Sequence, residues 1–454
     1  MRMNNSFICT LAALGVLLAL PAAAKVSSQE SDKLGRELTP VGAEKAANAD
    51  GSIPAWSPVG QSGPLSGVYP SNPAVDAEKP LFTITKANLA QYSGMLSEGH
   101  KYLLNRYPTY KMNVYPSHRP VAFPDFIYEW TKWNATNCEL IGTDNPHNCK
   151  IGFTYPIPQS GAEVIWNQRV RYRGEAARRY NNQMIVHAGG DYQLTKIVEE
   201  AKFYYAVRPE KGAVPLMKDS GLFLKYFSKT VSPPRMAGLL ILVHERAGAG
   251  NEGRQAWLYS PALKRTRRAP TVCCDNPYEG TDGHQFYDQV DMFNGLLDRF
   301  SWKLLGKREM ILPYNSNKIA GPTVKFKDLA SPSHLDPNLP RYEKHRFWVV
   351  EATIRQGTNH TFHKRLMYID EDSWYPSAID NYDARGQLVQ LQEGHTIYAP
   401  NVQSVGGVPE VIYHFDSGNY FVTAMANEDK PNDFSVVLPD EDFEPANIAR
   451  RANR

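Results

Sequence analysis

Two stretches in the first half of the chain carry apolar residues at the three-to-four-residue spacing of an amphipathic helix. The first covers residues 86–106 and follows Thr85, which can cap its amino end. The second starts at Ser160, where Glu163 completes an S-x-x-E capping box, and continues through "AEVIWNQRVRYRGEAARRY". The pattern therefore predicts two helices in this part of the chain.

From about Tyr192 onward, the apolar residues follow the two-residue period of a β-strand. In "HRFWVVEATIR", for example, Trp348, Val350 and Ile354 share one face. "GLLILVHER" and "RQAWLYSP" precede this segment, and "PEVIYHFDSGNYFVTAM" forms a late hairpin around Ser417-Gly418. Because short turns join successive strands, the sequence predicts an antiparallel meander and an α+β, mostly β fold.

The stretch "HERAGAGNEGRQAWLYS" places Gly248, Gly250 and Gly253 in the G-x-G-x-x-G spacing of a dinucleotide-binding turn. Such a site needs a helix after the glycines, because the helix N-terminus holds the pyrophosphate. The segment that follows, "RQAWLYSP", is instead β-type and ends at Pro261. The glycines are therefore interpreted as the mobile tip of a β-hairpin.

The first 24 residues have the features of a secretory signal peptide. A basic start, "MRMNN", precedes the apolar run "FICTLAALGVLLAL" and an A-x-A arrangement that ends at Ala24. The run is short for a membrane span, so we expect cleavage after Ala24 and export. Residues 25–84, rich in Pro and Gly, are expected to lie along the body as an extended lead-in, and residues 85–454 to form one domain.

The charge balance excludes one class of partner. Lys and Arg number 50 and Asp and Glu 47, and residues 1–24 contain one arginine and no acid. This near neutrality argues against a nucleic-acid partner. Any electrostatic partner must be recognised by a local patch.

Two basic clusters are the candidates for such a patch. The predicted second helix contains Arg169, Arg171, Arg173, Arg178 and Arg179. These arginines form either a solvated face paired with acids, which is the simpler interpretation, or a surface for anionic lipid or a protein. The second cluster, a candidate for an anionic headgroup or a membrane, comprises Lys264, Arg265, Arg267 and Arg268. Neutralisation by the acids downstream is the alternative.

Four cysteines follow the signal segment: Cys138, Cys149, Cys273 and Cys274. Export favours disulfides, and four cysteines allow three pairings. Cys138–Cys149 closes a short, turn-rich loop and is the preferred pair. Cys273 and Cys274 could form a vicinal disulfide or stay reduced, and cross-pairing is the alternative.

Motifs for catalysis or metal binding are absent from the sequence. The acidic residues 275–298 lack the D-x-D-x-D-G frame of a calcium loop, and no C-x-x-C is present. His360 and His363 lie three apart on a predicted strand and so face opposite sides. Neither G-x-S-x-G nor H-E-x-x-H occurs. We expect no catalytic residue, metal or cofactor.

Apolar and aromatic residues on the strand faces remain as candidates for lining a cavity for an apolar ligand. These are Trp257, Tyr259, Trp348, Val350, Ile354, Phe362 and Leu366. Ordinary core packing against the two helices is the alternative, and the simpler one for any single residue.

Several segments together resemble a proteobacterial periplasmic family of unknown function. Its members are described as outer-membrane lipoprotein-sorting proteins and placed near the carriers LolA and LolB. The matching segments include "LTPVGAEKAANADGSIPAW", "GAEVIWNQRVRYRG", "AWLYSPALKRTRRAPTVCCDNP" and "DMFNGLLDRFSWKLLGKREMILPYN". The resemblance implies a large curved, incompletely closed antiparallel sheet, a LolA/LolB-like half barrel, with helices over its concave face. The adjacent Cys273 and Cys274 depart from the family's pattern.

The resemblance also implies a periplasmic carrier or chaperone, and not an enzyme. Such a carrier would hold a lipid or lipoprotein acyl chain and pass it toward the outer membrane. An exporter of the resistance–nodulation–division type and an outer-membrane acceptor are the expected partners. Two alternatives stay open: a structural adaptor that docks on an exporter without a ligand, and an enzyme acting on a lipid or glycan through Asp282 or His284.

Overall fold

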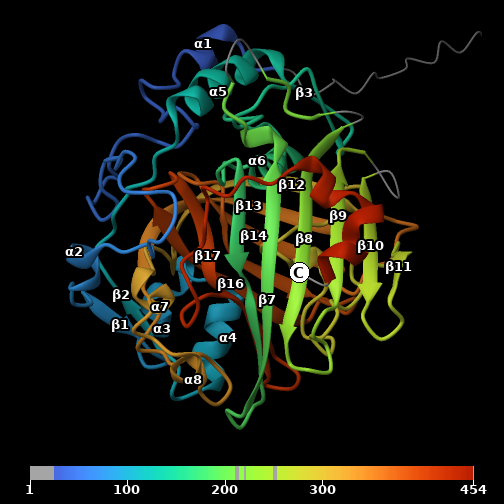
Figure 1. Ribbon diagram of the computed structural model, residues 1–454. Coiled ribbons are helices and arrows are strands. Elements are labelled where there is room, and N and C mark those ends of the chain that lie inside the picture. Colours follow the sequence, from blue (N-terminus) through green and yellow to red (C-terminus); the bar gives the residue numbers. More distant parts are fainter. Residues whose placement is uncertain (1–24, 210–213, 219–220, 249–252, 453–454) are drawn as a thin grey trace, which may run out of the picture.

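The computed structural model describes residues 25–209, 214–218, 221–248 and 253–452 (Figure 1). Within these ranges, the main element of the fold is one 16-stranded sheet. The predicted signal peptide, residues 1–24, lies outside the described residues. The sheet is not closed, and its strands are antiparallel except where β2 (Met112–Val114) meets β13 (Tyr342–Ile354).

Two antiparallel meanders make up most of the sheet. The first contains β6 (Asn182–Val186), β7 (Tyr192–Phe203), β8 (Leu222–Ser232), β9 (Leu240–Arg246), β10 (Arg254–Ser260) and β11 (Arg265–Arg268). The second contains β12 (Phe300–Pro313), β13, β14 (Lys364–Asp370), β15 (Pro376–Tyr382), β16 (Leu388–Ala399), β17 (Ser404–His414) and β18 (Tyr420–Met425). Strand β18 pairs with β6, which joins the two meanders into one surface. The predicted meander and its late hairpin are thus confirmed.

Short strands complete the sheet and a small separate one. Strand β5 (Ala176–Tyr180) pairs with β7, and β1 (Phe82–Ile84) pairs with β2. Strands β3 (Glu139–Ile141) and β4 (Asn145–His147) form a two-stranded sheet. The disulfide Cys138–Cys149 closes this hairpin, as preferred from the sequence, and a second disulfide joins Cys273 to Cys274.

The helices are short and lie at the ends and faces of the sheet. They are α1 (Ser28–Ser31), α2 (Pro73–Asp76), α3 (Leu89–Tyr92), α4 (Glu98–Arg106), α5 (Asp125–Asn137), α6 (Gly161–Arg169), α7 (Asn317–Ala320), α8 (Phe326–Leu329) and α9 (Ile448–Ala452). None of the helices in the described ranges combines the length and apolar character that a bilayer span requires.

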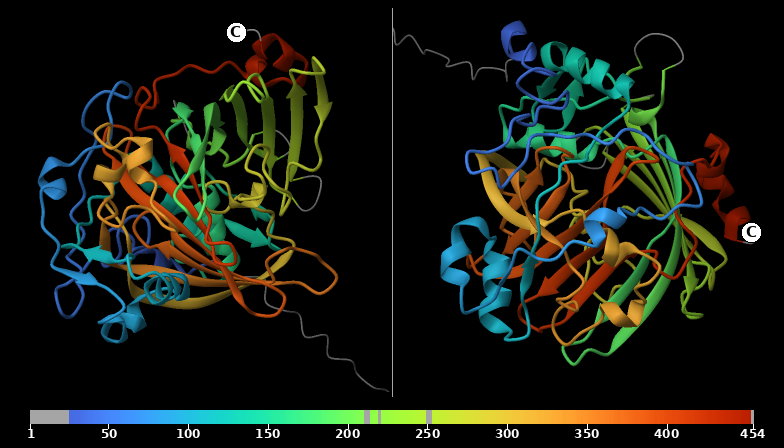
Figure 2. Two further views of the ribbon diagram at one scale, coloured as in Figure 1. Left: turned by 90° about the horizontal axis from the view of Figure 1, so that it is seen from below. Right: turned by 90° about the vertical axis from the view of Figure 1, so that its left-hand side faces the viewer.

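Helix α6 lies inside the curve of the sheet. Every one of its residues is buried, and it shares one hydrophobic core with β7 and β8 of the first meander and β13 to β17 of the second. Strands from both halves can contact one short helix only because the sheet curls around it, as Figure 2 shows. Gly161 lets the helix approach closely, since a Cβ there would stand 3.0 Å from Val350 Cγ1.

The capping of α6 follows its sequence. The Ser160 hydroxyl accepts the backbone N–H of Glu163 at 3.3 Å, as the capping pattern predicts. The Glu163 carboxylate, however, accepts from the backbone of Gln159. The helix ends at Arg169, so its predicted continuation to residue 180 is wrong.

Helix α4 packs on the opposite face of the second meander. Leu103 and Leu104 belong to a core that also contains Val349 and Tyr368, whose neighbours Val350 and Met367 face α6. The single helix predicted over residues 86–106 is wrong, because Ser97 caps a new helix by accepting the N–H of His100 at 3.2 Å. The sequence interpretation also missed α5, which begins after Pro124.

The lead-in lies along the body. Ile53 is fully buried, and Trp56 donates its indole N–H to the Val121 carbonyl at 2.9 Å. Residues 431–452, here called the C-terminal strap, cross the outer side of β8 to β10 (Figure 2). The strap buries Leu438, Phe443 and Ile448 against that face.

Candidate functional site

An interior cavity of about 80 Å³ lies between α6 and strands β7 to β9. Its volume exceeds several-fold what one water molecule requires. The apolar wall comprises Ala201, Phe203, Phe223, Leu224, Ile241, Val243, Val272, Val290 and Phe293. The polar wall comprises Gln168, Arg169, Arg173, Arg179, Glu245, Arg254, Asp291 and Asn294, and Tyr226, Tyr278 and Tyr287 add phenol rings. The cavity is therefore amphipathic.

A second cavity of about 100 Å³ adjoins the first. The two share Arg173, Arg179, Phe203 and Asp291, so these side chains form a common wall. Glu410, on β17, lines only the second cavity. The two cavities therefore adjoin at a wall that carries charged groups.

Of the five arginines that the sequence placed on a helical surface, Arg173 and Arg179 line this wall, whereas Arg178 is 47% exposed and pairs with Glu200, as the solvated-face interpretation expected. Arg171 is buried, with a side chain only 1% exposed, and the Arg173 side chain is 16% exposed. Both the solvated-face and the lipid-surface interpretations are wrong for these two residues. The reason is that the chain leaves α6 after Arg169 and runs extended through the interior to β5, which carries Arg178 and Arg179.

Asp291 is the counter-ion at the centre of the site. Its carboxylate forms ion pairs with Arg171 and, at 2.6 Å, with Arg173. Burial raises the pKa of Asp291, but the two guanidinium groups outweigh burial and hold it below its usual value. One carboxylate thus faces two buried cations, which leaves positive charge beside the cavity.

A second pair stands next to this centre. Arg179 donates to Glu199 at 2.7 Å, and Glu199 also accepts from Asn181 at 2.6 Å and from Tyr226. Burial lowers the pKa of Arg179, but Glu199 and Asp291 outweigh it and raise that pKa above its usual value. Arg179 is therefore held as a cation at the shared wall.

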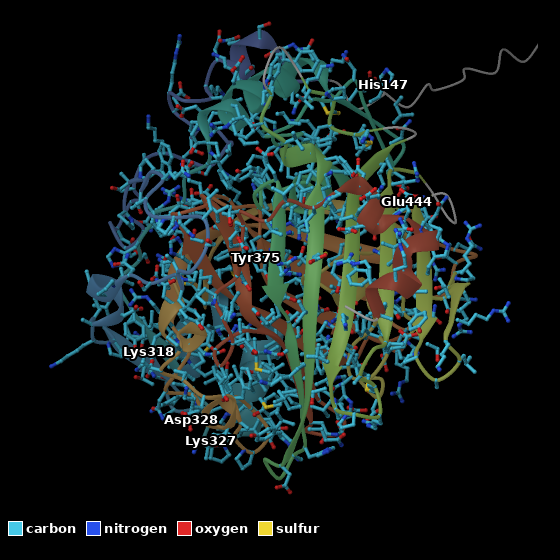
Figure 3. All side chains as sticks on the ribbon, viewed as in Figure 1. His147, Lys318, Lys327, Asp328, Tyr375 and Glu444 are labelled. Atoms are coloured by element: carbon cyan, nitrogen blue, oxygen red, sulfur yellow. A yellow bond between two sulfur atoms is a disulfide. The ribbon has the colours of Figure 1, made fainter. Side chains whose placement is uncertain are left out.

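The pKa of Glu410 is shifted in the opposite direction from that of Asp291. It accepts the Tyr375 hydroxyl at 2.6 Å, and Tyr375 lies near the centre of the molecule in Figure 3. Burial, together with the nearby negative charge of Asp291, raises the pKa of Glu410 to about 7. The charge of the second cavity therefore changes near neutral pH.

The deep end of the first cavity carries another charged group. Arg169 stacks over the Trp166 ring at 4.6 Å and lies 3.9 Å from Glu245, which also pairs with Arg254. Among the described residues, the buried Gln168 Oε1 and Tyr287 hydroxyl have no hydrogen-bond partner. Both residues line the cavity, so polar atoms are available there to a bound molecule.

The seven apolar ligand candidates lie elsewhere: none of them lines either cavity. Trp257 and Tyr259 pack against the C-terminal strap on the outer face. Trp348 and Val350 belong to the filled core around α6. The role of these four residues as ligand contacts stays a prediction.

Ile354, Phe362 and Leu366 also contact protein groups. Ile354 ends β13, and Leu366 packs on the core of the opposite face. The buried Phe362 ring lies 5.0 Å from the Arg365 guanidinium, beside the pair His360–Asp288. Six of the candidates lie on strands, as predicted, whereas Phe362 precedes β14, and the sequence could not tell a filled face from a hollow one.

The basic run sits at the edge of the sheet. Lys264, Arg265, Arg267 and Arg268 are all exposed, on β11 and the turn before it. Arg267 is near enough to Glu279 to lower the pKa of that carboxyl, although burial raises it more strongly. The run is therefore open to solvent, and its partner stays a prediction.

The acidic segment and the histidines do not form a common site. Asp288 pairs with His360 and Arg365 in the core, whereas Asp282 and His363 are exposed. His284 contacts the His414 ring at 5.1 Å. No group of three or more His, Cys, Asp or Glu side chains in the described ranges could hold a metal ion.

The glycine-rich stretch lies between β9 and β10, which pair as an antiparallel hairpin. The strand after the glycines is confirmed, and no helix follows them. Residues 249–252, on which the prediction of mobility rests, lie outside the described residues.

One sequence signal could have indicated the interior arginines. Arg169, Arg171 and Arg173 are spaced by two, a period that fits extended chain better than helix. Their counter-ion Asp291 is 120 residues away from Arg171, so the pairing itself has no local signal.

Comparisons with known proteins identify the family of this chain. The model of a family described as proteins of unknown function, DUF1329, matches residues 83–449. The chain belongs to the DUF1329 family. An uncharacterized protein of Pseudomonas aeruginosa is 39% identical over 449 residues, which cover 96% of each chain.

Solved structures of low sequence identity also match this DUF1329 chain. An outer membrane lipoprotein-sorting protein domain from Vibrio parahaemolyticus is 14% identical, with a TM-score of 0.43, over 64% of this chain and 98% of that one. A LolA superfamily protein from Nitrosomonas europaea is 11% identical, with a TM-score of 0.38, over 63% of this chain and 98% of that one.

Proposed function

We propose that this protein is a non-enzymatic carrier that holds an anionic amphiphile, a lipid or a lipoprotein acyl chain, inside its curved sheet. The observation that carries the proposal is the amphipathic interior space. Its wall combines apolar residues, among them Phe223, Ile241 and Val243, with charged residues such as Arg173 and Arg179. An apolar tail and an anionic head would each meet a matching wall, and the cavities, of about 80 and 100 Å³, would widen to admit an acyl chain.

The energetics favour such a ligand. Burial of an apolar tail gains roughly 25 cal/mol per Å² of surface removed from water. An anionic head would compete with Asp291 for Arg171 and Arg173, two cations that share one carboxylate. Charge-assisted hydrogen bonds to guanidinium groups are among the stronger polar contacts in proteins. The head would therefore fix the orientation of the ligand and the tail its affinity.

The setting of the proposed carrier is the periplasm. The signal-like residues 1–24 and the two disulfides support export into an oxidising compartment. We propose transfer toward the outer membrane in cooperation with an inner-membrane exporter of the resistance–nodulation–division type. The family resemblance supports this partnership.

The basic run at β11 would bring the carrier to an anionic membrane surface. Leu263, at the turn before β11, is 72% exposed beside Lys264, Arg265 and Arg267. An apolar tip flanked by cations suits the interface of a membrane that contains anionic lipid. Strand β11 leads through Ala269 to Val272, which lines the first cavity.

The test is lipid analysis of the protein purified from its own periplasm. Native mass spectrometry and solvent extraction should find one anionic amphiphile per chain. Ile241→Trp, which fills the apolar end, should abolish this mass, while Thr353→Trp, at an exposed position of β13, should keep it. Thermal unfolding of both variants checks that they fold. A wild-type protein without bound or exchangeable hydrophobe overturns the proposal.

A further inference from the structure

A surface groove of about 680 Å³ lies beneath the first part of the C-terminal strap. The strap supplies one wall through Phe434, Ser435, Val436, Val437 and Leu438. The lead-in, the start of α5, the segment after α6 and β5 supply the other walls through Leu65, Pro124, Tyr172, Gly174 and Ala176. This volume is in the range of sites for small organic molecules, and the lining is mostly apolar.

Phe434 separates this groove from the interior. It lines both the groove and the second interior cavity. Its ring packs over Gly174, where an added Cβ would stand 3.5 Å from Phe434 Cδ1, and Gly174 has a φ of +80°. The backbone N–H of Phe434 donates to the Leu65 carbonyl at 3.0 Å. One side chain thus lies between a surface groove and a buried space.

The strap is anchored on both sides of this residue. Asp433 and Arg178 exchange two backbone hydrogen bonds of 2.8 Å. Beyond Phe434, the Asp440 carboxylate accepts from Lys202, Tyr204 and Lys218. Between these anchors, Val437 is 87% exposed. Leu438 is buried against the outer face of the sheet and its carbonyl accepts from Lys202 at 3.1 Å, so the strap backbone is held on both sides of residues 435–437.

The groove carries charges of both signs, since Glu175 also lines it and its carboxylate accepts the backbone N–H of Arg208 at 3.1 Å. Lys202 lines it but is engaged by Asp440 at 2.9 Å. Arg208 lines it as well and is exposed, with its guanidinium 5.5 Å from the Phe126 ring. A head with a negative charge would meet Arg208 first.

We propose that this groove is the portal through which an anionic amphiphile reaches the interior, with Phe434 as its gate and Arg208 as its first headgroup contact. The inference rests on the proposed carrier function and adds a route to it. The tail passes when the Phe434 side chain turns away from Gly174. The head then meets Arg173 and Arg179 at the wall shared by the two cavities.

Stopped-flow uptake of a fluorescent polyene fatty acid, cis-parinarate, tests the gate. Phe434→Ala should raise the association and dissociation rates together by about tenfold and change the dissociation constant little, because a gate alters the path and not the end states. Phe434→Trp should slow both rates. Tyr192→Ala is the matched control, since Tyr192 is an exposed aromatic residue at the start of β7 that lines neither the groove nor the two cavities, and it should behave as wild type.

The outcomes separate the gate from the site. If rates are equal in wild type, Phe434→Ala and Phe434→Trp, while Ile241→Trp still abolishes binding, the gate is wrong and the interior site stands. If Ile241→Trp binds the probe as tightly as wild type, the interior site is wrong, and the portal to it falls as well. If wild type takes up no probe, both proposals fail.

The role of Arg208 as a headgroup contact is tested separately. Arg208→Gln should slow association of both cis-parinarate and dodecyl phosphate by about threefold, and leave the uncharged methyl ester of the fatty acid unaffected, because steering acts on charge. Dodecyl phosphate is followed by its competition with cis-parinarate. Slowing for one anion alone assigns Arg208 to the carboxylate or to the phosphate. Equal rates for charged and uncharged probes overturn its role.

Discussion

The two meanders of the sheet differ in how their faces are covered. In β12 to β15, one face is filled by α6 and the other by α4, and Ile369 and Ile379 are fully buried, whereas β16 and β17 border the second cavity. In β6 to β11, the inner face borders a cavity and the outer face lies under the strap with its groove. The same alternation of apolar and polar residues thus builds a filled half, which fixes the shape, and a hollow half, which can hold a ligand.

The largest effect is expected at the charged wall of the hollow half. Asp291→Asn should lower the free energy of unfolding by about 3–5 kcal/mol, because Arg171 and Arg173 would lose the carboxylate that compensates their burial. Urea denaturation measures the loss. Asp282→Asn, at an exposed position of the same segment, should stay within about 0.5 kcal/mol of wild type. If Asp291→Asn lowers the free energy of unfolding no more than Asp282→Asn does, the Asp291 carboxylate does not stabilise this wall.

The next effect concerns pH. The pKa of Glu410 is raised to about 7 in the folded protein, so the neutral form is the stable one there. Its contribution is complete below its unfolded pKa and is lost as pH rises through about 7. Wild type should therefore lose about 3 kcal/mol of unfolding free energy between pH 5 and pH 8 relative to Glu410→Gln.

The same titration should change binding. At pH 8 the Glu410 carboxylate adds negative charge beside Asp291 and Tyr375, so an anionic ligand should bind more weakly than at pH 6. Glu410→Gln should remove most of this difference. Parallel pH curves for wild type and variant, in stability or in binding, would contradict the raised pKa.

A smaller effect compares the two faces directly. Ile369→Ala, in the filled half, should cost about 4 kcal/mol, and Ile241→Ala, beside the cavity, about 2 kcal/mol, because a residue that borders a void has fewer contacts to lose. Equal losses in chemical denaturation would mean that the interior of the hollow half closes in solution.

The smallest effect on stability is expected at the edge of the hollow half. Replacement of Lys264, Arg265, Arg267 and Arg268 by Gln should change the unfolding free energy by less than about 0.5 kcal/mol, because exposed charges contribute little. Co-sedimentation with phosphatidylglycerol vesicles should nevertheless fall strongly. The control is the double variant Lys318→Gln and Lys327→Gln, whose two exposed residues lie at the lower left of Figure 3, away from β11. This variant should keep vesicle binding. Equal loss in both variants would remove the membrane role from β11.

The strand pattern was predictable because each strand has one face buried, and that leaves a local alternation. Trp348 and Val350 illustrate this, since both face α6 as their spacing requires. The preferred disulfide Cys138–Cys149 was predictable because only a short loop separates the two residues. Local sequence was sufficient in these cases.

The hollow half was not predictable for the opposite reason. The wall of the cavity depends on Asp291 meeting Arg171 and Arg173, which are more than a hundred residues distant. Whether apolar residues such as Ile241 border a void or a neighbour depends on what packs opposite them. Neither property leaves a local pattern, and the arginines followed a helical stretch closely enough to be assigned to it.

Anomalous scattering from crystals grown with 12-bromododecanoate tests the central claim most directly. The account predicts a bromine peak in the first cavity, in contact with Phe223 and Ile241, and the carboxylate beside Arg173 and Arg179. A peak confined to the groove under the strap or to the surface, with the interior unchanged, would contradict the claim that the hollow half of the sheet carries the ligand.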